Sequence, residues 1–182
     1  PVQNALASIV QPSAVAGRVV RSWIGMSRGD NGKTRVTFVW EPMPVSPGLR
    51  REQAGRVSLL VASPQGAVLY RGKVAPSAPP AAAGAPASSS APAAPASVSF
   101  DVPPGKLEMR MSVEGATGGV IDNEQRDITV PDLAAASSLI STPRVFRART
   151  PREAQALAKD PAAVPAVARD FSRTERVIIR FD

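Results

Sequence analysis

The sequence of 182 residues contains no cysteine and no histidine. Their absence excludes Ser-His-Asp and Cys-His nucleophile systems, thiolate and imidazole metal sites, haem ligation and disulfide bonds. Carboxylate or lysine chemistry remains, but the 15 acidic residues form no recognisable metal loop, and no glycine-rich phosphate-binding loop precedes a helix. We therefore expect a non-enzymatic protein that needs no cofactor.

Aromatic residues are also scarce, at 4%, and no apolar run reaches the roughly 18 residues that a membrane-spanning helix requires. Proline and glycine are plentiful, with 19 and 13 residues, which indicates many short elements separated by turns. Because 43% of the residues are hydrophobic, the chain has enough apolar residues to form a folded core. Together with the many turns, this composition predicts an all-β protein. We expect neither a membrane span nor a small-molecule substrate.

The net charge of +7 raises the question of a nucleic-acid partner. The arginines are scattered, however, and they lack the interleaved aromatic residues of a single-strand binding platform. Their densest cluster comprises Arg144, Arg147, Arg149 and Arg152. We therefore expect protein partners or neighbouring domains of the same chain, and no nucleic acid.

Apolar residues at every second position predict short strands. The clearest is TRVTFVWE at 34–41, with Val36, Phe38 and Trp40 on one face. In the final stretch, ERVIIRF at 175–181, Val177 and Ile179 are predicted to point inward together with Phe181. Further strands are expected at 19–26, 56–63, 67–74, 97–102, 106–114, 120–121 with 128–130, and 143–149.

This series predicts two antiparallel sheets packed face to face, as an immunoglobulin-like or fibronectin type III-like sandwich. A small barrel is the alternative. Met109 and Met111 alternate along one predicted strand, which favours core filling over an adaptable groove.

Composition divides the chain into three parts. Residues 1–13 are interpreted as a lead-in from a preceding domain, and 14–133 as the β-sandwich domain, which carries a long Ala/Pro-rich loop at 75–97. Residues 134–182 are interpreted as a linker, a short helix and the first strand or strands of a second β-rich domain. Thr150-Pro151-Arg152-Glu153 matches a capping box, which predicts that the helix runs to about Lys159. The last strand either completes the sandwich or opens the second domain.

Arg28, Gly29 and Asp30 spell a tripeptide that many matrix proteins present to integrins. They lie between two predicted strands, and the following Asn31 and Gly32 readily adopt positive φ. The stretch is therefore predicted to be a hairpin turn. A tripeptide that binds integrins would also have to lie at an exposed hairpin tip, so adhesion through these residues stays as the alternative hypothesis.

Several longer stretches occur in a familiar order: GKTRVTFVWEP at 32–42, FDVPPGKLEMRMSVE at 100–114, RDITVPDL at 126–133, PRVFRARTPREAQAL at 143–157 and FSRTERVIIRF at 171–181. Together they resemble the region that follows the von Willebrand factor A-like (VWFA-like) domain in large secreted VWFA-related proteins of soil bacteria, acidobacteria especially. The resemblance implies an extracytoplasmic, non-enzymatic β-sandwich beside a ligand-binding A-type domain. It supplies no metal site, because Asp122, Asp127 and Asp132 all lack the serine spacing of the DxSxS pattern.

Three functions are compared. The leading hypothesis is a structural or interaction module that spaces or presents a neighbouring VWFA-like domain and docks other envelope proteins. The second is adhesion through Arg28-Gly29-Asp30. The third is an enzyme, which would require Asp122 to meet Glu124 or Asp127 in a pocket.

Overall fold

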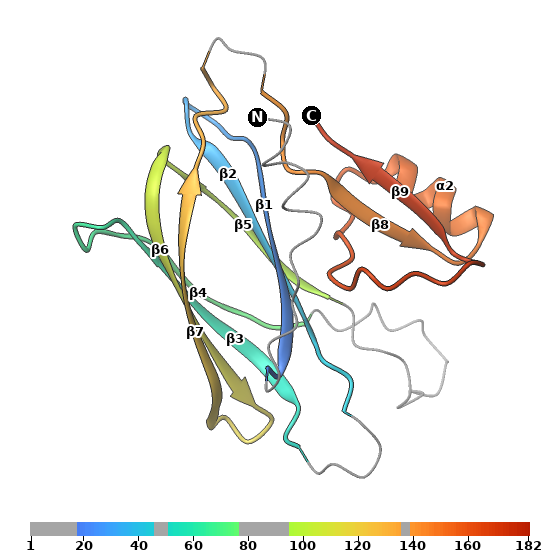
Figure 1. The fold of residues 1–182 in the computed structure, drawn as a ribbon, viewed down its shortest axis with the longest axis horizontal. Coiled ribbons are helices and arrows are strands. Elements are labelled where there is room, and N and C mark those ends of the chain that lie inside the picture. The colour runs from blue at the N-terminus through green and yellow to red at the C-terminus, as the bar shows by residue number, and fades with distance from the viewer. Residues whose placement is uncertain (1–17, 46–50, 77–94, 136–138) are drawn as a thin grey trace, which may run out of the picture.

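The computed structural model describes residues 18–45, 51–76, 95–135 and 139–182 (Figure 1). Nine strands and one short helix lie in these ranges. The predicted lead-in at 1–13 lies outside the described residues, and so does most of the predicted loop at 75–97. The division of the chain into domains at these positions stays a prediction.

Seven strands form two antiparallel sheets. The first sheet has the order β1-β2-β5, and the second has the order β4-β3-β6-β7. The strands are β1 Val20–Arg28, β2 Thr34–Pro42, β3 Ala54–Ala62, β4 Val68–Val74, β5 Ala96–Val102, β6 Gly105–Gly115 and β7 Val120–Val130. The predicted all-β antiparallel sandwich is confirmed.

The hydrophobic core lies between the two sheets and contains the predicted faces of the strands. Val36, Phe38 and Trp40 of β2 are buried there, and the Trp40 indole donates a hydrogen bond of 3.0 Å to the carbonyl of Val74. This bond satisfies the only polar atom of the indole in the apolar interior. Met109 and Met111 are buried in the same core, so the core-filling interpretation is confirmed.

The two open edges of the sandwich are closed by different contacts. At one edge, the rings of Tyr70 in β4 and Phe100 in β5 stack with centroids 4.3 Å apart. At the other edge, β7 turns charged residues inward, and Glu124 forms ion pairs with Arg18 and with Arg126. Charges that point inward from an edge strand oppose pairing with another chain.

Three predictions about strands are wrong in part. β7 is continuous through its polar middle at 122–127, because its residues pair with β6 along their whole length. Alternation in the strand predicted at 67–74 places Val68 on one face with Tyr70 and Val74, yet Val68 is 54% exposed and Val74 is buried, since the register shifts by a bulge between Val61 and Ala62. Val177, Ile179 and Phe181 were predicted to point inward and are exposed instead.

Residues 139–182, here called the terminal unit, contain β8 Arg144–Ala148, α2 Pro151–Lys159 and β9 Arg176–Arg180. The helix is confirmed over its predicted length: the Thr150 hydroxyl accepts a hydrogen bond from the Glu153 amide, and the Glu153 carboxylate accepts one from the Arg149 amide. β8 and β9 form a separate two-stranded sheet, so β9 joins neither sheet of the sandwich.

The terminal unit lies on the outer face of the β1-β2-β5 sheet (Figure 1). Trp23 of β1 and Val39 of β2 form a second apolar cluster with Val167. Thr142 adds two hydrogen bonds to Met26, one from its amide to the Met26 carbonyl at 2.8 Å and one from the Met26 amide to its hydroxyl at 3.0 Å. Among the described helices, none is long and apolar enough to cross a membrane.

Candidate functional site

The tripeptide Arg28-Gly29-Asp30 occupies the approach to the hairpin between β1 and β2, as the sequence predicts. Asn31 and Gly32 have φ of 54° and 72°, and the Lys33 amide donates to the Asp30 carbonyl. Positive φ at both central residues is typical of a hairpin turn that matches strand twist. The predicted turn is therefore confirmed.

The three residues of the tripeptide differ in exposure and in their contacts with the rest of the protein. The Arg28 side chain is exposed and has no ion pair with any described residue. The Asp30 carboxylate is 77% exposed, yet it lies 2.9 Å from the guanidinium of Arg35. Gly29 is hemmed in, because an added Cβ would lie 2.8 Å from the Arg35 amide nitrogen and 2.9 Å from the Lys33 carbonyl oxygen. Close packing against the backbone therefore explains why position 29 is a glycine, without any contact to a receptor.

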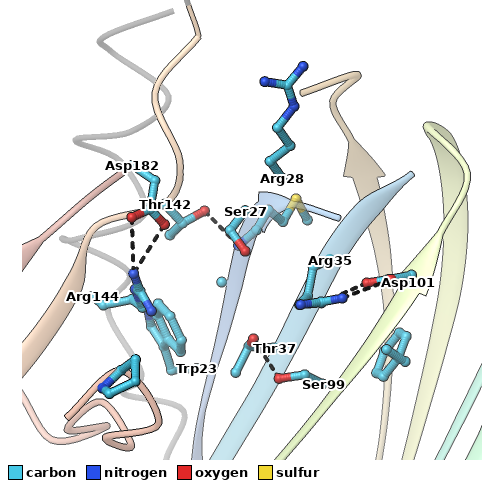
Figure 2. A pocket seen from close by; sticks show the side chains of 14 residues that line it. Trp23, Ser27, Arg28, Arg35, Thr37, Ser99, Asp101, Thr142, Arg144 and Asp182 are labelled. Carbon is cyan, nitrogen blue, oxygen red and sulfur yellow. Dashed lines mark hydrogen bonds and ion pairs between the residues drawn. The ribbon is translucent and has the colours of Figure 1, made fainter. Parts of the chain in front are cut away.

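A cleft of about 560 Å³ separates the outer face of the β1-β2-β5 sheet from the terminal unit (Figure 2). We call it the outer cleft. Its floor includes Thr37 of β2 and Ser99 of β5, whose hydroxyls lie 2.9 Å apart. Thr142, Arg144, Pro161 and Asp182 come from the terminal unit, and the tripeptide contributes Arg28 at the rim. The volume is in the range of small-ligand pockets.

Ion pairs neutralise most of the charge in the outer cleft. Arg35 donates through Nε and Nη2 to the two carboxylate oxygens of Asp101, at 2.8 and 3.0 Å. These hydrogen bonds lower the pKa of Asp101 and raise that of Arg35. Arg144 similarly donates to Asp182 at 3.1 Å. In Figure 2 these guanidinium groups, and that of Arg28, point in different directions and do not converge on one ligand position.

The outer cleft therefore offers hydroxyl groups and two ion pairs, and of these the pair between Arg144 and Asp182 leaves the buried Nε of Arg144 without an acceptor among the described residues. Arg35 and Asp101 lie 66 positions apart in sequence, so local patterns could not have predicted that they meet. The alternation in the sequence predicts only that Arg35 lies on the face of its strand opposite Val36, Phe38 and Trp40. The residues of the cleft that come from the terminal unit, Thr142, Arg144, Pro161 and Asp182, face hydroxyl and charged side chains of β2 and β5 across the cleft.

Next to the cleft, the contact between sandwich and terminal unit buries charges. Burial raises the pKa of Glu41, although Arg21, Arg147 and Arg169 and a hydrogen bond from the Ala168 backbone oppose that rise. Burial also lowers the pKa of Arg169, against the attraction of Glu41. The attraction between Glu41 and Arg169 offsets part of the effect of burial on each group, while both Nη atoms of Arg169 are buried without a hydrogen-bond acceptor among the described residues.

The acidic residues considered for catalysis or for the DxSxS metal pattern all lie in or after β7. Asp122 and Glu124 share its inward face, where Asp122 accepts a hydrogen bond of 3.4 Å from the Val19 amide, while Asp127 faces outward. Glu124 borders a cavity of about 10 Å³, room for about one water molecule. Asp132 instead accepts hydrogen bonds from the amides of Ala134 and Ala135.

An apolar surface on β9 is the feature that sequence reasoning missed. Seven large hydrophobic side chains are exposed in the described part of the chain, and five of them lie at 139–140 and 177–181. Val177 and Ile179 share one face of β9, and Phe181, directly after the strand, is 62% exposed. Period-two alternation shows that a strand has an apolar face, but it does not show whether anything covers that face.

The chain matches no protein-family model, no curated protein and no solved structure.

Proposed function

We propose that this chain is a non-catalytic structural and interaction module of a larger extracytoplasmic bacterial protein. The observation that carries the proposal is the fixed attachment of the terminal unit to the sandwich, which leaves the apolar face of β9 in solvent. Trp23, Val39 and Val167 hold the two parts together, so a partner that binds β9 is held at a defined position. Contiguous exposed apolar surface is the usual sign of a protein-binding site.

The proposed neighbour is a VWFA-like domain, which this module spaces or presents to envelope partners. The support is the order of stretches that resemble VWFA-related proteins, from GKTRVTFVWEP at 32–42 to FSRTERVIIRF at 171–181. We further infer a fibronectin type III-like sandwich, because β4 pairs with β3 in the second sheet. In the constant-type immunoglobulin order, the fourth strand belongs to the first sheet.

The complete reading frame of the natural gene tests this proposal. We expect an export signal and an upstream A-type domain that contains its own DxSxS metal site. A reading frame with neither feature would contradict both the location and the presenting role.

Adhesion through Arg28-Gly29-Asp30 is the second candidate, favoured by the exposure of Arg28 and Asp30 at the hairpin. The ion pair between Asp30 and Arg35 weighs against it, because a receptor would have to compete for that carboxylate. Surfaces coated with wild-type protein or with Asp30→Glu should bind integrin-bearing cells equally if the tripeptide is only a turn. Attachment that depends on Asp30 would instead support adhesion.

A further inference from the structure

We propose that β9 is a docking edge for an extended acidic–apolar strand of a different protein, which adds to the β8-β9 sheet. This assignment rests on the proposed interaction role and specifies its chemistry. Within the described residues, β9 pairs with β8 alone, so its other edge carries backbone amide and carbonyl groups without strand partners. Such an edge accepts a further strand by main-chain hydrogen bonds.

The side chains of β9 determine what such a strand must look like. On one face, Val177 and Ile179 continue into Phe181, and all three are exposed. The hydrogen bonds between Ser141 and Asp182 bring the exposed Leu139 and Ile140 to the same end of the strand. A partner therefore gains most from apolar, β-branched residues at alternate positions, which would pack beside this surface.

The other face of β9 selects for acidic residues. Arg176 is exposed and has no ion pair with a described residue. Arg180, by contrast, is engaged inside the terminal unit, because its Nη1 donates to the Asp160 carbonyl at 2.8 Å and its guanidinium lies over the Phe146 ring. β9 itself contains no carboxylate. Residues directly opposite each other in antiparallel strands are stabilised by opposite charge. A carboxylate opposite Arg176 thus completes the pairing.

The same charges argue against a second copy of this chain as the occupant. An antiparallel pair of β9 strands centred on Ile178 would place Arg176 of each copy opposite Arg180 of the other, which is repulsive. A pair centred on Ile179 would place Arg176 opposite Asp182, but Arg144 already holds that carboxylate at 3.1 Å. The net charge of +7 adds general repulsion between copies.

A peptide of sequence TEVTIET is the probe that tests the proposal. Aligned antiparallel to β9, it places glutamates opposite Arg180 and Arg176, and valine and isoleucine opposite Ile179 and Val177. We expect it to shift the backbone amide signals of residues 176–181 in the nitrogen-15 NMR spectrum of the whole chain, and to slow their hydrogen exchange. The charge-reversed peptide TKVTIKT should bind about tenfold more weakly, because the attractive pair at Arg176 becomes repulsive and a second lysine is placed opposite Arg180.

A matched pair of variants controls for folding. Ile179→Lys should abolish binding of TEVTIET, whereas Val68→Lys should bind it as the wild type does, since both side chains are 54% exposed on edge strands. Equal binding of TEVTIET and TKVTIKT would overturn the proposed charge selection. Shifts elsewhere in the chain, or concentration-dependent self-association that protects the β9 amides, would overturn the proposed occupant.

The peptide experiment and the reading frame of the gene test the docking edge and the proposed function separately. If the peptide fails to bind but the reading frame contains an A-type domain and an export signal, only the docking edge is refuted. If the peptide binds and neither feature is found, the docking edge stands and the presenting role is refuted.

Discussion

At the residue scale, backbone packing determines that the middle residue of the Arg28-Gly29-Asp30 tripeptide is a glycine. An added Cβ would meet backbone atoms of Lys33 and Arg35 within 3 Å, so Gly29→Ala forces the hairpin to shift. We expect a loss of about 1–3 kcal/mol in the free energy of unfolding, measured by urea denaturation. Gly119→Ala is the control, because its nearest atom is 3.9 Å away, and it should change stability little. Equal losses for both variants would contradict this explanation.

Glu114 gives a second prediction at this scale. Hydrogen bonds from Ser58 and Arg56, and the charge of Lys73, lower the pKa of its carboxyl from 4.5 to about 2. A lowered folded-state pKa stabilises the protein above the unfolded-state value, and this stabilisation is lost as pH falls from about 4.5 toward about 2. Glu114→Gln should therefore lower the melting temperature at pH 7, and the difference from wild type should vanish near pH 2.

The control for that pH series is Glu108→Gln, on the same outward face of β6. Among the described residues, Glu108 forms only an exposed ion pair with Arg110 at 3.3 Å, which contributes little to stability. A difference between wild type and Glu114→Gln that stays constant from pH 7 to pH 2 would show that the charge is not responsible.

At the scale of elements, most strands and the helix were predictable because each has a local signal. β2 was predicted at 34–41 and runs over Thr34–Pro42, and α2 follows directly from its capping box. The middle of β7 was not predictable, because Asp122, Glu124 and Arg126 occupy inward positions that alternation assigns to apolar residues. Their reason is tertiary: Arg18 and Val19, at the start of the described chain, supply the partners.

Glu124 is the central member of that edge contact, with a side chain only 12% exposed. Glu124→Ala leaves the guanidinium groups of Arg18 and Arg126 without their shared acceptor. We expect a cost of about 1–3 kcal/mol in urea denaturation, since half-buried charged groups lose a hydrogen-bonded partner. Asp127→Ala on the exposed face of the same strand should stay within about 0.5 kcal/mol of wild type. The reverse order of the two effects would refute an inward role for Glu124.

At the scale of the whole molecule, two hydrophobic clusters have separate tasks. The larger one lies inside the sandwich and involves all seven of its strands, whereas the smaller one joins only Trp23, Val39 and Val167, with Val164 beside them. Alternation separates Trp23 and Val39 from the core-facing residues of their strands, but the sequence could not show that the segment around Val167 covers them. Outward apolar residues thus mark the attachment of the terminal unit.

Trp23→Ala should therefore loosen the terminal unit without unfolding the sandwich. Loss of a buried tryptophan costs about 3–5 kcal/mol, and here that loss falls on the smaller cluster. We expect the amides of residues 144–182 to exchange hydrogen much faster in the variant, measured by mass spectrometry, while those of β2, β3 and β6 stay protected.

Val177→Ala is the comparison, because its side chain is 45% exposed and touches neither cluster. It should leave exchange in both parts unchanged. If Trp23→Ala speeds exchange equally in the sandwich and in the terminal unit, the two unfold together, and the molecule is one cooperative body. If it speeds exchange in neither, Thr142 and the charges around Glu41 suffice to hold the terminal unit, and the apolar cluster is not what fixes β9 in place.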